Sequence, residues 1–210
     1  MGTVENNPKK ENIMKKVLLT VATVLVMSSL VMAQVPAPPI SFYGGGALSL
    51  PSSPSGFSDG WKTGYHGFVG VGFSVAPKVK VVGKVEYHNF ASNFGLTNLD
   101  GGNMKVLMFG PEAQLSLGAP MVPIKPFLSA GAGMASVSFA DFTGTDPLVA
   151  ALNTANSGGS NTNFFYSIGG GLEFSIGPTA AFFVQARYAT ITGGGGSTSY
   201  LPISVGLKIF

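Results

Sequence analysis

Residues 201–210 read LPISVGLKIF. Every second residue from Leu201 to Ile209 is apolar, and the residues between them are small or polar. Strict alternation is the period of a β-strand with one apolar and one polar face. Because only the aromatic Phe210 follows, we expect this strand to be the last element of the fold.

Seven further segments carry the same alternation. Each is long enough for the roughly 9–11 residues that a tilted strand needs to cross a membrane. The eight segments cover about residues 40–50, 64–75, 79–90, 104–117, 124–139, 163–176, 181–191 and 200–210.

The links between these segments alternate between long and short. The longest spans about residues 140–162, where residues 146–152 (DPLVAAL) suggest one helical turn, whereas residues 76–78 (APK) form a short link. Short periplasmic turns, longer external loops and an even strand number are typical of outer-membrane barrels. The sequence therefore predicts an all-β fold, an eight-stranded antiparallel up-and-down transmembrane β-barrel with both termini in the periplasm.

The composition agrees with a membrane location. Charged residues make up 10% of the chain, against about 25% in ordinary globular proteins. The formal net charge is +3, but four Lys and two Glu precede residue 34. The rest of the chain has eight basic and seven acidic residues. This nearly equal number of basic and acidic residues gives no support for nucleic-acid binding. The chain has no cysteine, which excludes disulfides and thiolate metal sites.

The first 33 residues have the pattern of an export signal. Lys15 and Lys16 precede an apolar run from Val17 to Met32, and Ala33 completes a cleavage site of short residues. We interpret residues 1–33 as an N-terminal extension plus a cleaved signal peptide, with Met14 as the expected start. Residues 34–210 are then the barrel. The alternative is a retained membrane anchor.

Polar and charged side chains share one face of the expected strands. In residues 79–90, Lys84 and Glu86 alternate with Val85 and Tyr87. In lipid the apolar face points outward, so the charges face the lumen. Buried charges persist only when paired, and eight strands enclose just enough room for side chains. We therefore predict a lumen plugged by an ion-pair network. Its members are Lys84, Glu86, Glu112, Glu173, Arg187 and Lys208. Segments 40–50 and 124–139 are rich in Gly and Ala, which leaves their phase open.

Aromatic residues gather near the external ends of the strands. Such residues form girdles at the membrane interface. The predicted girdle is Trp61, Tyr65, Tyr87, Tyr166, Tyr188 and Tyr200. The alternative is ordinary packing of aromatic residues in a β-core.

His66 and His88 are the side chains able to act as a base near neutral pH. His88 lies in residues 87–93, YHNFASN, which distantly resemble the His-x-Ser-Asn stretch of the outer-membrane lipid A deacylases. Ser92, however, follows His88 by four residues rather than two. A catalytic Ser–His pair needs hydrogen-bond distance, so this spacing disfavours an enzyme. No metal and no cofactor are expected, since neither His has further ligands at suitable spacing.

The signal, the eight segments, the alternating links and the terminal Phe together resemble the small outer-membrane β-barrel superfamily. These are the OmpA-barrel, OmpX-like and opacity-type "porin family" proteins, and the resemblance covers about residues 34–210. It implies that Phe210 is a signal for the barrel-assembly machinery. Phe210 is out of phase with the outward residues Leu207 and Ile209, which implies a bulge or a final residue beyond the ladder.

Three functions follow as hypotheses. The leading one is a non-enzymatic, monomeric outer-membrane protein among lipid and lipopolysaccharide, whose external loops contact a host or cell-surface partner or support envelope integrity. Loops displayed on a rigid scaffold commonly carry binding. The alternatives are a small porin or conduit for small or apolar solutes, and a lipid A-modifying barrel enzyme.

Overall fold

The structure is a computed structural model that describes residues 40–93, 99–118, 122–145, 147–156, 160–193 and 196–210. The predicted signal peptide, residues 1–33, lies outside the described residues, as do residues 34–39 at the start of the predicted barrel domain.

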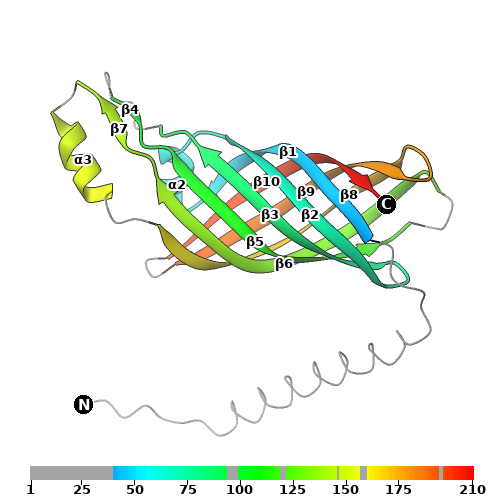
Figure 1. Cartoon of the computed structure of the whole chain (residues 1–210). Helices are drawn as coiled ribbons and strands as arrows, with labels where there is room; N and C mark the ends of the chain where they lie inside the picture. The colour runs from blue at the N-terminus through cyan, green and yellow to red at the C-terminus, as the bar shows by residue number, and fades with distance from the viewer. Residues whose placement is uncertain (1–39, 94–98, 119–121, 146, 157–159, 194–195) are drawn as a thin grey trace, which may run out of the picture. The chain divides into compact units, whose positions relative to one another are not determined.

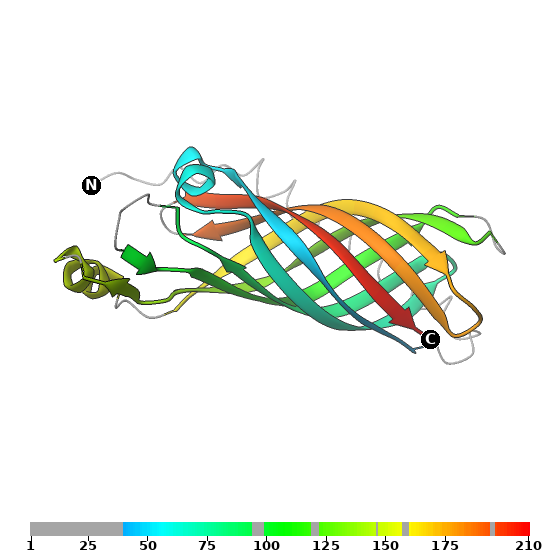
Figure 2. The ribbon, with the colours of Figure 1, turned by 90° about the horizontal axis from the view of Figure 1, so that it is seen from above.

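Eight strands close into one antiparallel barrel, as the alternation predicts (Figures 1 and 2). Neighbours in the chain are neighbours in the barrel, and the first strand pairs with the last, from Phe42 opposite Ile209 to Ser53 opposite Ser199. The strands are β1 (Ile40–Ser53), β2 (Gly64–Ala76), β3 (Val79–Phe90), β5 (Met104–Ser116), β6 (Ile124–Phe139), β8 (Asn161–Ser175), β9 (Ala180–Gly193) and β10 (Gly196–Ile209).

The outer wall of the barrel is apolar. In β10, Leu201, Ile203, Val205, Leu207 and Ile209 are all exposed, whereas the alternate residues are buried. Leaving such a row of large apolar side chains in water would be costly, while hydrocarbon solvates it. The alternation therefore separates a lipid-facing row from a row that fills the lumen.

Missing side chains on the inner wall make room for aromatic rings. A Cβ added to Gly206 would lie 2.7 Å from Cζ of Phe183, and one added to Gly72 would lie 2.7 Å from Cε2 of Tyr43. Both distances are shorter than van der Waals contact. The glycines thus let large rings extend across a narrow lumen.

The two ends of the barrel differ. At the end that we call the turn end lie the links β2–β3, β5–β6 and β8–β9, together with Ile40 and Phe210. The opposite loop end carries α2 (Ser55–Gly60), a small sheet of β4 (Leu99–Gly101) and β7 (Phe142–Gly144), and α3 (Leu148–Asn156) (Figure 1). α3 begins later and runs further than the helical turn expected at residues 146–152. No helix in the described part of the chain is long and apolar enough to span a membrane.

Candidate functional site

The centre of the lumen holds four charged side chains from three strands. Arg187 of β9 bonds through Nη2 to Glu86 of β3, and its Nη1 lies 3.2 Å from Oε2 of Glu112 of β5. Nζ of Lys84 lies 3.2 Å from Oε1 of Glu86 and 3.2 Å from Oε2 of Glu112. All four are at most 6% exposed. Two cations and two carboxylates thus form one neutral group, which we call the central network.

Two glutamines complete the hydrogen bonds of Glu112. Its Oε1 accepts from Nε2 of Gln114 at 2.8 Å and from Nε2 of Gln185 at 3.1 Å. Gln185 also donates to Oγ of Ser129 at 2.9 Å. A buried carboxylate is stable only when its oxygens are paired and hydrogen-bonded, so these amides belong to the network as much as the charges do.

The other two predicted members, Lys208 and Glu173, form a separate pair near the turn end. Nζ of the fully buried Lys208 lies 2.8 Å from Oε2 of Glu173, and Nζ of Lys80 approaches the same oxygen at 3.9 Å. The structure therefore places the six predicted residues in two groups, and each group balances its own formal charge.

An aromatic layer lies between the two groups. Nζ of Lys84 is 5.0 Å from the ring centroid of Phe68, and Phe68 contacts Phe183, which contacts Tyr43. Nζ of Lys208 lies 5.9 Å from the Tyr43 centroid. Together with Val82 and Phe127, these rings form a buried cluster that separates the charges.

Two histidines and a serine lie on the loop-end side of the central network. Oγ of Ser49 is 2.9 Å from Nδ1 of His66 and 2.9 Å from Nδ1 of His88, and the centroids of the two rings are 4.3 Å apart with their planes tilted by 32°. A hydroxyl can donate to one imidazole and accept from the other. Oε2 of Glu86 lies 3.4 Å from Nε2 of His88. This Ser49–His88–Glu86 chain was missed in the sequence because the phase of segment 40–50 was open.

The Ser–His pair considered from the sequence does not form. Oγ of Ser92 donates to the carbonyl of Gly101 at 2.7 Å, while His88 points into the lumen. Within the described ranges, no three His, Asp or Glu side chains are grouped so as to hold a metal ion.

A second apolar cluster lies in the lumen toward the loop end. Phe57 of α2 packs edge-on against Phe90, which packs against Tyr200. Met104, Val106 and other buried residues complete the cluster. A small cavity of about 10 Å³ beside Arg187 is at the lower limit for one water molecule.

Four of the predicted girdle residues, Tyr65, Tyr87, Tyr166 and Tyr188, are exposed on the outer wall toward the loop end. Trp61 is half-buried beside Phe139, at a centroid distance of 5.7 Å. The assignment of Tyr200 to the girdle is wrong. Tyr200 is fully buried in the lumen, where its hydroxyl donates to Sδ of Met108 at 2.6 Å. It shares the inward phase of Ser204 and Lys208, and phase rather than height along the strand decides its side.

Phe210 lies beyond the ladder, one of the two arrangements that its phase implied. β10 ends at Ile209, and the backbone N–H of Phe210 donates to the carbonyl of Thr179 at 2.9 Å. Nζ of Lys208 is 4.1 Å from the centroid of the Phe210 ring. Its role as an assembly signal stays a prediction.

A closed eight-stranded barrel with an apolar outer wall and paired charges inside defines a small transmembrane β-barrel of the bacterial outer membrane. The family model described as "Outer membrane protein beta-barrel domain" matches residues 19–208, and the chain belongs to that family.

Solved structures share the fold. Neisserial surface protein A (NspA) aligns with a TM-score of 0.60 at 17% identity, over 83% of this chain and 99% of that one. Ail, the attachment invasion locus protein of Yersinia pestis, aligns with a TM-score of 0.50 at 15% identity, over 82% of this chain and 99% of that one. No curated protein matches the chain.

Proposed function

We propose that this protein is a non-enzymatic outer-membrane barrel whose lumen is closed and whose loop end binds a partner at the cell surface. The observation that carries the proposal is the filling of the lumen. From the loop end inward lie Phe57 and its cluster, the His–Ser group, the central network, the aromatic layer and the Lys208–Glu173 pair. This succession supports a plugged barrel rather than a conduit.

The buried Ser49–His88–Glu86 chain supports a structural role over catalysis. A hydroxyl, an imidazole and a carboxylate do lie next to one another in space in the order that hydrolases use. Ser49 and His88, however, are both fully buried beneath the apolar cluster of the loop end. A hydrolase must bring a substrate to its nucleophile, and a serine with no exposed surface offers none for a substrate to reach.

The loop end is built as a platform rather than as loose loops. The side-chain amide of Asn153 in α3 pairs with the backbone of Phe142, accepting from its N–H at 2.7 Å and donating to its carbonyl at 2.9 Å. Phe142 is buried, and β7 pairs with β4 of another link. β4, β7 and α3, which we call the loop platform, thus fix each other, and preorganised loops bind with a smaller entropic cost.

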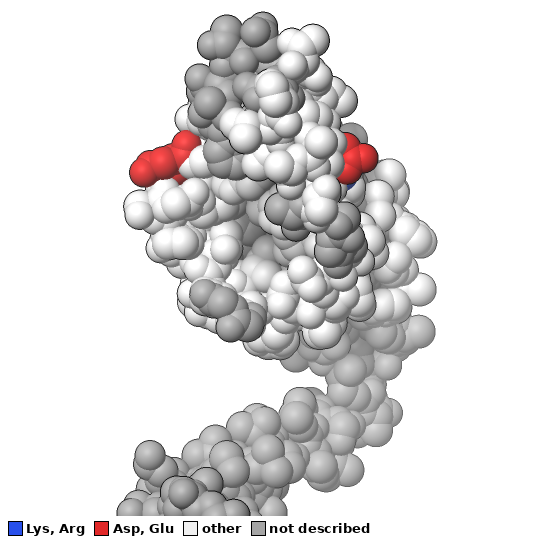
Figure 3. Space-filling model, turned by 90° about the vertical axis from the view of Figure 1, so that its left-hand side faces the viewer, with Lys and Arg blue, Asp and Glu red and all other residues white. Residues whose placement is uncertain are grey.

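The surface of the loop end favours an uncharged or cationic partner. Asp59, Asp100 and Asp141 are exposed there, against Lys62 and the half-buried Lys105. Figure 3 looks onto this end, where most of the described surface is uncharged and acidic groups stand at two edges. Ail has been crystallised with the heparin analogue sucrose octasulfate. The acidic balance here argues against a sulfated polysaccharide as the partner of this chain.

Two experiments test the proposal. Refolded protein in a planar bilayer should show negligible conductance, and steady channels would refute the plugged lumen. Replacing residues 148–156 by a Gly–Ser linker should preserve heat-modifiable gel mobility but abolish adhesion of expressing cells to epithelial monolayers. The control replaces residues 194 and 195, the link between β9 and β10. Unchanged adhesion with the first variant, or equal loss with both, would refute a binding role for the loop platform.

A further inference from the structure

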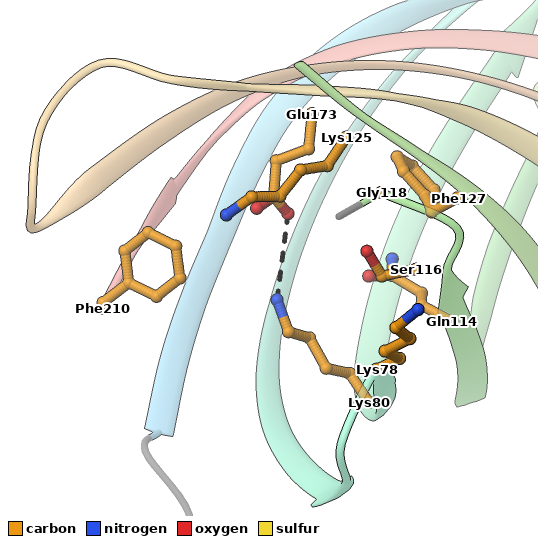
Figure 4. A pocket seen from close by; sticks show the side chains of 9 residues that line it. All are labelled: Lys78, Lys80, Gln114, Ser116, Gly118, Lys125, Phe127, Glu173 and Phe210. Atoms are coloured by element: carbon orange, nitrogen blue, oxygen red, sulfur yellow. Dashed lines mark ion pairs between the residues drawn. The ribbon is translucent and has the colours of Figure 1, made fainter. Parts of the chain in front are cut away.

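The turn end of the barrel contains a cavity that the proposed function does not use. It has a volume of about 230 Å³ and opens at the mouth of the lumen (Figure 4). Its lining includes Lys78, Lys80, Lys125, Ser116, Glu173 and Phe210. We call it the vestibule.

The vestibule has more lysines than carboxylates, because Lys78, Lys80 and Lys125 line it together with Glu173 and the terminal carboxylate of Phe210. Oε2 of Glu173 accepts from Lys208 at 2.8 Å, and Lys80 approaches the same oxygen at 3.9 Å. Within the described ranges, no ion-pair partner is recorded for Lys78 or Lys125. Figure 4 shows Lys80 pointing toward Glu173, with Lys78 next to Lys80 and Lys125 next to Glu173, its partner in the β6–β8 register. A concave site with surplus positive charge attracts anions.

The vestibule is closed at its inner side. Phe127 lines it and belongs to the buried aromatic layer that separates Lys208 from the central network. An anion that enters can therefore be held but has no path onward through the described lumen. At the rim, the ring of Phe210 lies 5.7 Å from Nζ of Lys80, which leaves an aromatic face beside the ammonium groups.

We propose that the vestibule binds a phosphate group. Lysine ammonium groups act as point charges that bind phosphate from several directions, whereas a planar carboxylate is better matched by the fork of an arginine. Lys78 and Lys80 at the β2–β3 turn, Lys125 on β6 and the hydroxyl of Ser116 suit a tetrahedral phosphate anion. The volume accommodates phosphate with a small organic group attached. Such a group belongs to a free phosphomonoester or to a phospholipid headgroup.

The test uses the folded barrel in neutral dodecyl maltoside micelles. Binding of sn-glycerol 3-phosphate is measured by isothermal titration calorimetry for the original protein and for K78Q/K125Q. The matched control is K62Q/K105Q, which removes the same charge at the loop end. We expect K78Q/K125Q to weaken binding at least tenfold and the control to weaken it less than twofold.

Several outcomes decide the matter. Absence of binding to the original protein, or equal weakening by both variants, would overturn the proposal. Retained heat-modifiable mobility of each variant ensures that the barrel is folded. Addition of phosphatidylglycerol to the micelles identifies the source. Displacement of glycerol phosphate by this lipid, but not by phosphatidylcholine, assigns the site to a lipid headgroup, and lack of displacement assigns it to soluble phosphate compounds. A failure here leaves the conductance and adhesion results untouched.

Discussion

Replacing Arg187 by methionine should strongly destabilise the barrel. The guanidinium contacts both carboxylates of the central network, Glu86 and Glu112, and is 2% exposed. After its removal Lys84 alone faces two buried carboxylates. Breaking a buried ion pair by removing one partner costs about 3–5 kcal/mol because it leaves an uncompensated charge. Methionine fills much of the arginine stem, so the loss reflects charge rather than a cavity.

Equilibrium unfolding in urea, in lipid vesicles at pH 7, measures this change. The single tryptophan, Trp61, packs beside Phe139 at the loop end and reports unfolding by its fluorescence. The control is R187M/E86Q, in which one cation and one carboxylate remain. This double variant should be about 1–2 kcal/mol more stable than R187M, since neutrality is restored. A loss below about 1 kcal/mol for R187M, or a double variant no more stable than R187M, would refute the view that charge balance holds the central network together.

Three further changes have defined outcomes. Lys208→Met should cost about 2 kcal/mol in the same unfolding assay, less than the loss of the arginine, because Glu173 keeps a second lysine at the mouth; an equal loss would contradict this. Gly102→Ala should disorder the loop platform but not the barrel, since Gly102 has φ +66° and an added Cβ would collide with the ring of Phe142. We expect faster proteolysis within residues 142–156 at unchanged heat-modifiable mobility. Unchanged proteolysis would contradict this prediction. Tyr200→Ala should cost about 3–5 kcal/mol and Tyr200→Phe about 1 kcal/mol or less, because the first leaves a cavity and the second removes one hydrogen bond; similar losses for both would assign the stabilisation to the hydroxyl.

The side of the wall on which a residue lies was largely predictable. A period of two assigns Lys84, Glu86 and Glu112 to the lumen as soon as one face must meet lipid. Their partners were not predictable in the same way, because the stagger of the strands decides which residues share a height. The sequence therefore indicated six inward charges but not their division into four and two.

The site residues that could not be predicted from the sequence lie in segments where the alternation of apolar and polar residues carries little information. Segment 40–50 has glycine and alanine on both faces, so Ser49 gave no sign of its direction. Its contacts with His66 and His88 depend on two neighbouring strands. Tyr200 shows the opposite case, because its phase was readable from Lys208, but its height near the strand end suggested the girdle. A tyrosine serves equally in a girdle and in a lumen that offers its hydroxyl an acceptor.

The central network has a consequence for the order of folding. Lys84, Glu112 and Arg187 come from β3, β5 and β9, and Arg187 is 101 residues from Glu86 in the chain. Contacts at such separations form late, since the intervening chain must first be ordered. Before the barrel closes, each of these side chains contacts water or a charged group on the part of the sheet that has already formed. The network is therefore complete only when β9 faces β3 and β5 across the lumen, so closure of the barrel and neutralisation of its interior are one event.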